Sequence, residues 1–343
     1  MSATRVLIKD ASVVTLDPDL GDFPRADILV EDGDIVAVGP DLGASDAETI
    51  DASGQIAIPG FANTHLHTWQ HALRGVCCDW TVKDYVRCWR IHLGPMYRPE
   101  DMYAGNYAGA LDALNNGVTL VVDYCHNVVT RDHAREALRG LRDAGVRALF
   151  GLAYTPVLDH GFAAEVTQVE NEDLPDHDAR VRFAHQLAEE EFSSKDGLVT
   201  LAIVPQEIEI ADWDDVAAEF RSARELDAWI SIHANQVLAE QRWEDVRKLH
   251  RADLLGPDIL FVHCSFSADD ELQLIADSGA SVSVQAETEM QMGMGFPITA
   301  KLIEHGVAPS LGVDITSNGS GDMFAQMRMA LQVGRMLGDQ PHY

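Results

Sequence analysis

Apolar and polar positions are arranged in two different ways along this chain of 343 residues. From residue 61 onward, short apolar runs alternate with stretches of helical spacing such as RPEDMYAGNYAGALDALNNG and DWDDVAAEFRSARELD. This alternation is typical of parallel strands joined by crossover helices. The first predicted strand ends at His65/His67. The other seven lie at 118–126, 146–156, 198–207, 228–236, 259–266, 280–288 and 309–318. Eight such units predict an α/β fold, a (β/α)8 TIM barrel with its active site at the carboxyl ends of the strands.

The first 60 residues have a different pattern. VLIKDASVVTL, ADILVEDGDIVAVG and ETIDASGQIAIPG are short, rich in Val and Ile, and interrupted by Gly and Asp. The pair Asp32-Gly33 favours a tight hairpin turn. We therefore predict a small β-sandwich-like domain at 1–60 and the barrel at 61–343. The acidic stretch 159–196 is predicted to be a long loop plus one helix over the barrel mouth.

Composition narrows the functional classes. No apolar run approaches the roughly 20 residues that cross a bilayer, and the N-terminus MSATRVLIKDASVV lacks the regions of a signal peptide. The cysteines are odd in number and form no C-x-x-C pair, which favours reduced thiols; they are Cys77, Cys78, Cys88, Cys125 and Cys264. These features predict a cytoplasmic protein with no membrane partner.

The charge excludes another class. Asp and Glu total 55 against 25 Lys and Arg, for a formal net charge of −30, and a nucleic-acid backbone requires a basic surface. The acidity could attract a cationic substrate, or it could form the solvated, lysine-poor surface that keeps a halophilic protein soluble at high salt. The acids are scattered along the chain, which favours the second interpretation.

Candidate metal ligands stand at the ends of the predicted strands. His65 and His67 are two residues apart, so on an extended strand both side chains point to the same side while Leu66 faces away. His233, His263 and Asp314 end later strands. Each alone is most simply a buried structural residue, and Asp314 alone could be a helix cap. Together, four imidazoles and a carboxylate are the donor set of a hydrolytic Zn²⁺ or Fe²⁺ site.

Several motifs carry a resemblance to a known family. They are PGFANTHLHTWQHALRG, DWTVKDYVRCW, NNGVTLVVD, ISIHANQ, ILFVHCSF and SLGVDITSNGSGDMFAQMR. In these motifs the chain resembles the amidohydrolase superfamily, within the branch of cytosine-deaminase-like and triazine-hydrolase-like enzymes. The resemblance extends over nearly the whole chain and preserves the order of the motifs.

The resemblance implies a set of roles. His65, His67, His233 and Asp314 would bind one divalent metal, and His263 would lie within hydrogen-bond reach of the hydroxide or the substrate. The metal would lower the pKa of its water from 15.7 to about 7, and Asp314 would accept the proton and pass it to the leaving group. Two-metal relatives use a lysine on the fourth strand, and LAIVPQEIEI has none. One metal is therefore favoured, with Glu207 or Glu209 as the alternative bridge.

One departure from the family concerns proton transfer. Deaminases of this branch commonly have H-x-x-E after the fifth strand, whereas this chain has His233-Ala-Asn-Gln236. Glutamine forms hydrogen bonds but carries no proton at ordinary pH. Either Asp314 makes both proton transfers, with Gln236 as a hydrogen-bonding group, or the substrate needs no ring protonation. The stretch QAETEMQMGMGFP also departs from the family. Its Glu287 and Glu289 offer carboxylates near the barrel mouth, although a solvated loop is the simpler interpretation.

Other polar and aromatic residues are weaker candidates. Gln70, Arg74 and Asn318 could contact substrate, although Arg74 could equally form a structural ion pair. The aromatic residues Trp80, Tyr85 and Trp89 could line a ring pocket, but helical spacing of this kind is more often core. Four further histidines are expected to be structural or exposed; they are His71, His92, His126 and His305.

The resemblance implies a metal-dependent hydrolase that acts on carbon–nitrogen bonds other than peptide bonds. Hydrolytic deamination of a small pyrimidine, purine, triazine or amidine is favoured, with a different leaving group or opening of a cyclic amide as alternatives. Relatives usually continue past this chain's last residue to complete the N-terminal β domain. Unpaired strand edges would then invite association, so we expect a homo-oligomer or a poorly soluble fragment. A non-catalytic or truncated homologue is the second hypothesis.

Overall fold

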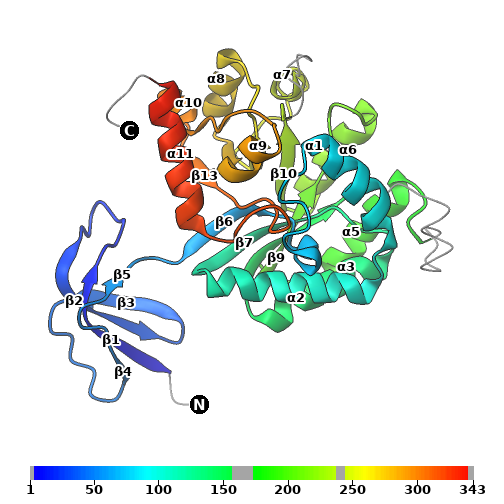
Figure 1. Ribbon diagram of the computed structural model, residues 1–343. Helices are drawn as coiled ribbons and strands as arrows, with labels where there is room; N and C mark the ends of the chain where they lie inside the picture. The colour runs from blue at the N-terminus through cyan, green and yellow to red at the C-terminus, as the bar shows by residue number, and fades with distance from the viewer. Residues whose placement is uncertain (1–3, 157–172, 237–243, 339–343) are drawn as a thin grey trace. The chain divides into compact units, whose positions relative to one another are not determined.

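The structure is a computed structural model that describes residues 4–156, 173–236 and 244–338. The chain forms two compact units, Met1–Gly60 and Phe61–Tyr343, and each is described by itself (Figure 1). Within the described ranges, no helix is both long enough and apolar enough to cross a membrane.

The N-terminal unit is one five-stranded sheet. Its strands are β1 (Arg5–Val13), β2 (Phe23–Glu31), β3 (Asp34–Gly39), β4 (Glu48–Asp51) and β5 (Ile56–Ala57). The order is β3-β2-β1-β4, and β5 also pairs with β1. The predicted hairpin is confirmed, because Asp32 and Gly33 connect β2 to antiparallel β3 with φ angles of 49° and 96°. Ala11, Val13 and Ile28 are part of its small apolar core.

The larger unit is a parallel barrel, which confirms the predicted fold class. Its strands are β6 (Phe61–Leu66), β7 (Val118–Cys125), β8 (Arg147–Ala153), β9 (Val199–Val204), β10 (Trp229–Ala234), β11 (Ile259–His263), β12 (Ser281–Val284) and β13 (Pro309–Leu311). Each strand pairs with the next in chain order. The ring closes just beyond β13, where His67 N donates to Asp314 O (2.7 Å) and Asp314 N donates to His65 O (2.9 Å).

Close backbone contacts at two glycines support this arrangement. A Cβ at Gly312 would lie 2.8 Å from both N and O of His65, so only glycine lets the end of β13 approach β6 this closely. A Cβ at Gly105 would lie 2.2 Å from Trp69 O. Gly105 therefore lets the helix that precedes β7 pack directly on the turn that follows β6.

Helices surround the barrel in the positions that the sequence pattern predicts (Figure 1). They are α2 (Pro99–Asn115), α3 (Arg131–Ala144), α5 (His177–Glu191), α6 (Trp213–Glu225), α7 (Asp245–Arg251), α8 (Asp269–Ser278), α10 (Thr299–Glu304) and α11 (Met323–Leu337). The connection from β6 to α2 carries η1 (Thr68–Leu73), α1 (Val82–Tyr85), the π-helix η2 (Val86–Leu93) and η3 (Gly94–Met96). The two quoted helical stretches correspond to α2 and α6.

The structure differs from two predictions about the segments between strands. Residues 286–288 were assigned to the seventh strand, and this assignment is wrong because β12 ends at Val284 and helix α9 (Ala286–Gln291) follows. Ala, Glu and Met are good helix formers, which explains the early change. Part of the acidic stretch, 157–172, lies outside the described residues. Its helix α5 buries Phe183 and Leu187 against the barrel wall, so it does not lie over the mouth.

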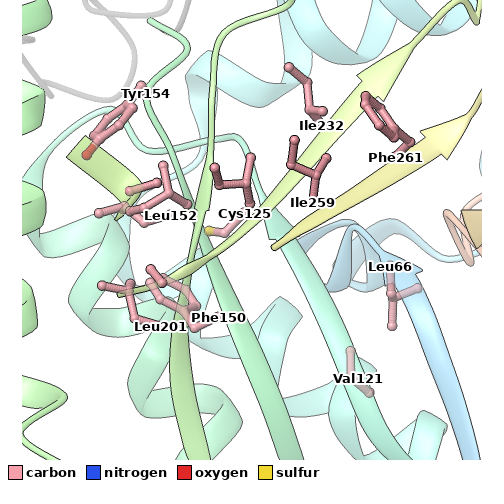
Figure 2. Close-up of a cluster of buried hydrophobic side chains, with 14 of the residues drawn as sticks. Leu66, Val121, Cys125, Phe150, Leu152, Tyr154, Leu201, Ile232, Ile259 and Phe261 are labelled. Carbon is pink, nitrogen blue, oxygen red and sulfur yellow. The ribbon is translucent and has the colours of Figure 1, made fainter. Parts of the chain in front are cut away.

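The main core runs along the barrel strands and the inner faces of the helices. Figure 2 shows apolar side chains from several of these strands gathered in one cluster, among them Leu66, Ile232 and Phe261. Successive residues of a strand point to opposite faces. The residues next to Leu66 and Ile232 are His65, His67 and His233, whose side chains therefore point into the barrel.

Candidate metal centre

Four imidazoles and one carboxylate converge at the carboxyl ends of the barrel strands. His65 and His67 lie at the end of β6, His233 lies in β10, His263 ends β11, and Asp314 follows β13. Their exposed fractions are 0%, 3%, 6%, 2% and 5%, respectively. The structure brings these five sequence-predicted residues together in one buried cluster.

The donor atoms of the cluster lie close to one another. His65 Nε2 is 3.4 Å from His233 Nε2. Asp314 Oδ1 is 3.3 Å from His65 Nε2 and 3.4 Å from His67 Nε2. Two ligands that are each about 2.1 Å from a tetrahedral ion lie about 3.4 Å apart. The spacing therefore fits ligands that share one divalent ion.

The second ring nitrogens of two histidines have fixed partners. His67 Nδ1 lies 2.9 Å from the carbonyl oxygen of Tyr124, and His233 Nδ1 lies 2.8 Å from Glu207 Oε1. An acceptor at Nδ1 places the proton there and leaves the Nε2 lone pair free, which is the arrangement typical of metal-binding histidines. His65 Nδ1 is buried and has no hydrogen-bond partner within the described part of the chain.

Glu207 lies behind His233 relative to the cluster. Its Oε1 accepts from His233 Nδ1, the nitrogen on the other side of the ring from Nε2. This carboxylate therefore orients a histidine in the described structure. Burial raises the pKa of both Glu207 and Glu209, and Glu209 also interacts with Asp245.

His263 has a carboxylate partner on helix α9. Its Nδ1 lies 3.2 Å from Glu289 Oε1, and both side chains are buried. The expectation that Glu289 belongs to a solvated loop is wrong, because α9 begins right after β12 and turns this carboxylate inward. Its neighbour Glu287 accepts a hydrogen bond from Gln326 instead.

Burial and mutual contacts determine the charges of the cluster. Burial lowers the pKa of His65, His67 and His233 and favours the neutral imidazole. Burial alone would raise the pKa of Asp314, but the contact with His65 and the other histidines lowers it below its usual range. Burial alone would also lower the pKa of His263, but Glu289 and Asp314 raise it overall.

Left-handed backbone conformations accompany the site. His263 and Asp314 each have a φ of 69°, and Cys264 and Asn235 have φ of 57° and 47°. On a regular strand the side chain of His263 would point to the same side as that of Phe261, which belongs to the apolar cluster. The His263 ring instead stacks on the ring of His233, with 5.3 Å between the ring centroids. The positive φ ends the strand alternation at His263. Such strained residues are concentrated at functional sites.

The remaining predicted site residues lie in the loops around the cluster. Gln236 is half-buried just beyond β10. Gln70 is buried, and its Nε2 donates to the hydroxyl of Tyr85 (2.6 Å). Asn318 Nδ2 donates to Gln291 Oε1 (2.8 Å). Arg74 is half-exposed and pairs with Asp112 on α2 (2.7 Å), so the structure does not bring it to the cluster.

Sequence reasoning missed His126. It was expected to be structural or exposed, but its ring stacks on His67 with centroids 4.0 Å apart and an angle of 14°. Trp69 Nε1 donates to its Nδ1 (3.1 Å). His126 follows β7 at the same end of the barrel as His65 and His67, so the rule that identified the other ligand candidates could have found it.

With this geometry established, comparison with known proteins identifies the family. The model of the amidohydrolase family matches residues 56–343. The chain belongs to the amidohydrolase family. Its members use a divalent metal, and the His-rich cluster fits one. The predicted resemblance is confirmed, and so is the prediction that the chain is an enzyme of this class.

Named relatives of this amidohydrolase are deaminases. It is 26% identical to the 5'-deoxyadenosine deaminase of Methanosarcina mazei over 95% of this chain and 72% of that protein. It is 32% identical to the 5-methylthioadenosine/S-adenosylhomocysteine deaminase of Natronomonas pharaonis over 86% of this chain and 66% of that protein. The chain thus spans about two thirds to three quarters of these relatives.

Solved structures share the fold. An adenosine deaminase from Xanthomonas campestris with bound zinc has a TM-score of 0.77 at 22% identity, covering 98% of this chain and 75% of its own. Atrazine chlorohydrolase from Arthrobacter aurescens, complexed with zinc, has a TM-score of 0.81 at 20% identity, covering 98% and 78%. These likenesses support the barrel assignment.

Proposed function

We propose that this amidohydrolase removes the amino group of a small N-heterocycle by hydrolysis. The observation that carries the proposal is the buried cluster of His65, His67, His233 and Asp314, whose donor atoms have the spacing of ligands to one ion. In this proposal these four residues hold a single divalent metal, Zn²⁺ first and Fe²⁺ second. Such an ion lowers the pKa of a bound water to about 7.

The protein's own groups handle the protons. Asp314 is buried with a lowered pKa, so at neutral pH it is an ionised carboxylate that can accept a proton from the attacking water. It then donates that proton to the departing amine. His263, held by Glu289 at 3.2 Å, faces Asp314 Oδ2 at 4.0 Å and stabilises negative charge that develops on the substrate.

The substrate class rests on the relatives and on the residue that follows His233. Two relatives are named as deaminases of adenosine derivatives, so amino-purines and their nucleosides are the first substrates to test. Gln236 cannot carry a proton, so in this proposal Asp314 makes both transfers. Gln236 also favours a second candidate: hydrolysis that expels a leaving group other than ammonia, or that opens a cyclic amide.

The composition supports a proposal about the cellular environment of the enzyme. We propose a cytoplasmic, halophilic enzyme, because the acidic residues outnumber the basic ones by 55 to 25 and all five cysteines of the described structure are free thiols. We also propose a homo-oligomer that acts on a small molecule and binds neither nucleic acid nor membrane.

An ammonia-release screen tests the proposal. The protein, purified in concentrated potassium chloride, is incubated with amino-purines, their 5'-substituted nucleosides, aminopyrimidines and aminotriazines, and products are separated by chromatography. We expect ammonia from at least one class, and loss of that activity in Asp314→Asn while the fold is retained. Conversion without ammonia would favour the second candidate. Full activity in Asp314→Asn would contradict the mechanism.

A further inference from the structure

His126 is the imidazole of this site that neither the family motif nor the proposed ligand set uses. It directly follows β7, is 2% exposed, and lies flat against the proposed ligand His67 at 4.0 Å. Its Nδ1 accepts a hydrogen bond from Trp69 Nε1, which belongs to the fully buried core.

This hydrogen bond determines where the proton of His126 is. The indole N–H of Trp69 can only donate, so Nδ1 of His126 carries a lone pair and the ring's proton is on Nε2. The two ring nitrogens point in nearly opposite directions, so Nε2–H points away from Trp69 and the core. His67, which stacks on this ring, has both of its own nitrogens engaged, by Tyr124 O and by the cluster.

The Nε2–H group has no acceptor in the part of the chain that the structure describes. Among residues 4–156, 173–236 and 244–338 no hydrogen-bond partner is found for His126 Nε2.

From this geometry we infer that His126 determines specificity by donating a hydrogen bond from Nε2–H to an acceptor atom of the substrate ring, with Trp69 as the residue that positions it. The inference rests on the proposed function for the nature of the substrate. An amino-heterocycle always carries ring nitrogens, and one of them would meet Nε2–H beside the proposed metal ligand His67. A ring with C–H at that position would leave the buried donor unpaired, which is strongly disfavoured.

The test combines variants of His126 with altered substrates. His126→Phe keeps a flat ring against His67 but has no donor, whereas His126→Gln places an amide N–H near the position of Nε2. Each variant and the wild type are assayed with the best amino-heterocycle of the ammonia screen and with its deaza analogues, in which one ring nitrogen is replaced by C–H. Metal content is measured in every sample.

We expect His126→Phe to lose about tenfold or more in kcat/KM with metal content unchanged. For the wild type and for His126→Gln, kcat/KM with one deaza analogue should be about tenfold or more below that with the parent ring. This preference should disappear in His126→Phe. If His126→Phe retains the full preference against every deaza analogue, or if its activity falls only because it loses metal, the inference is wrong.

A second measurement does not depend on turnover. NMR of protein labelled with ¹⁵N-histidine reports which nitrogen of His126 carries the proton, and we expect the Nε2–H form in the wild type and a mixture in Trp69→Phe. A proton on Nδ1 in the wild type would overturn the inference even if no substrate were found. Absence of ammonia release with any compound, by contrast, counts against the proposed function alone.

Discussion

Two histidines of the cluster are each held by a glutamate, which is partly buried at His233 and fully buried at His263, and the two pairs behave differently. His233 Nδ1 lies 2.8 Å from Glu207, and His263 Nδ1 lies 3.2 Å from Glu289. On the opposite side of each ring, His233 Nε2 faces His65 Nε2 at 3.4 Å, whereas His263 Nε2 faces Asp314 Oδ2 at 4.0 Å.

The difference shows that a glutamate partner does not by itself decide the charge of an imidazole. Burial and neighbouring imidazoles lower the pKa of His233 well below its ordinary value. His263 is also buried, but Glu289 together with Asp314 raises its pKa. The same pair of residue types thus gives a neutral ring with a free lone pair at one place and a hydrogen-bond donor at the other.

Glu207→Gln should have the largest effect on the metal among the variants of these pairs. It removes the negative charge behind His233 while preserving the shape of the side chain. We expect the affinity for Zn²⁺ to fall by about 10- to 100-fold, because such outer partners orient the ligand and increase its basicity. Competition with a chelator measures this. Glu209→Gln, two residues away, is the control and should retain nearly all of the affinity.

Glu289→Gln should separate the two pairs. We expect zinc affinity to stay within about twofold of the wild type and kcat/KM to fall by about tenfold, because His263 loses the anion that holds its ring and supports its donor. Glu287→Gln, on the same helix, is the control. If Glu289→Gln loses as much zinc affinity as Glu207→Gln, the proposed difference between the two His–Glu pairs is wrong.

Asp123 shows what a buried carboxylate does without an imidazole partner. Among the residues that the structure describes, its Oδ1 accepts only from Thr68 N and its Oδ2 has no partner. Burial raises its pKa from 3.8 to about 7. Between pH 3.8 and about 7 the folded state holds this proton more tightly than the unfolded state. A rise in pH over this range therefore lowers the free energy of unfolding by an amount on the order of a few kcal/mol. Asp123→Asn cannot ionise and should gain stability relative to wild type from pH 4 to pH 8.

Urea unfolding of metal-free protein at several pH values checks this prediction. Asp84 is the control, because hydrogen bonds from Thr81 lower its pKa, so the change for Asp84→Asn should have the opposite sign. If the difference in the free energy of unfolding between Asp123→Asn and the wild type does not change with pH, Asp123 is ionised in the folded protein.

Arg74→Ala should have the smallest effect. Its guanidinium is half-exposed and pairs with Asp112, and exposed ion pairs contribute about 0–1 kcal/mol. We therefore expect a small loss of stability in urea and kcat/KM within about twofold of the wild type. A large rise in KM would instead support the substrate role that the sequence left open for this residue.

The sequence predicted the barrel well because several of its strands, such as β9 and β11, are buried on both faces and therefore consist of nearly continuous apolar runs. It failed where a helix follows a strand without a break, at residues 286–288. The residues of the cluster were identifiable because each stands at a strand end. Glu289 was not, since its partner His263 is 26 positions away and only the course of α9 brings the two together.

One feature of the site had no signal in the sequence, and a second was overlooked. The left-handed φ of 69° at His263 and Asp314 is uncommon in residues other than glycine. Asp and His adopt it more often than most, but the great majority of them do not, so residue type did not mark these two positions. His126 was judged by itself, without the neighbours that β7 brings beside it.

The measurement that tests the central claim most directly is the metal content per chain of the wild type and of the His65→Ala/His67→Ala double variant, both purified in high potassium chloride. We expect one Zn or Fe per folded wild-type chain and none in the variant. Folded wild-type protein that binds no divalent metal, or a variant that binds as much as the wild type, would contradict it.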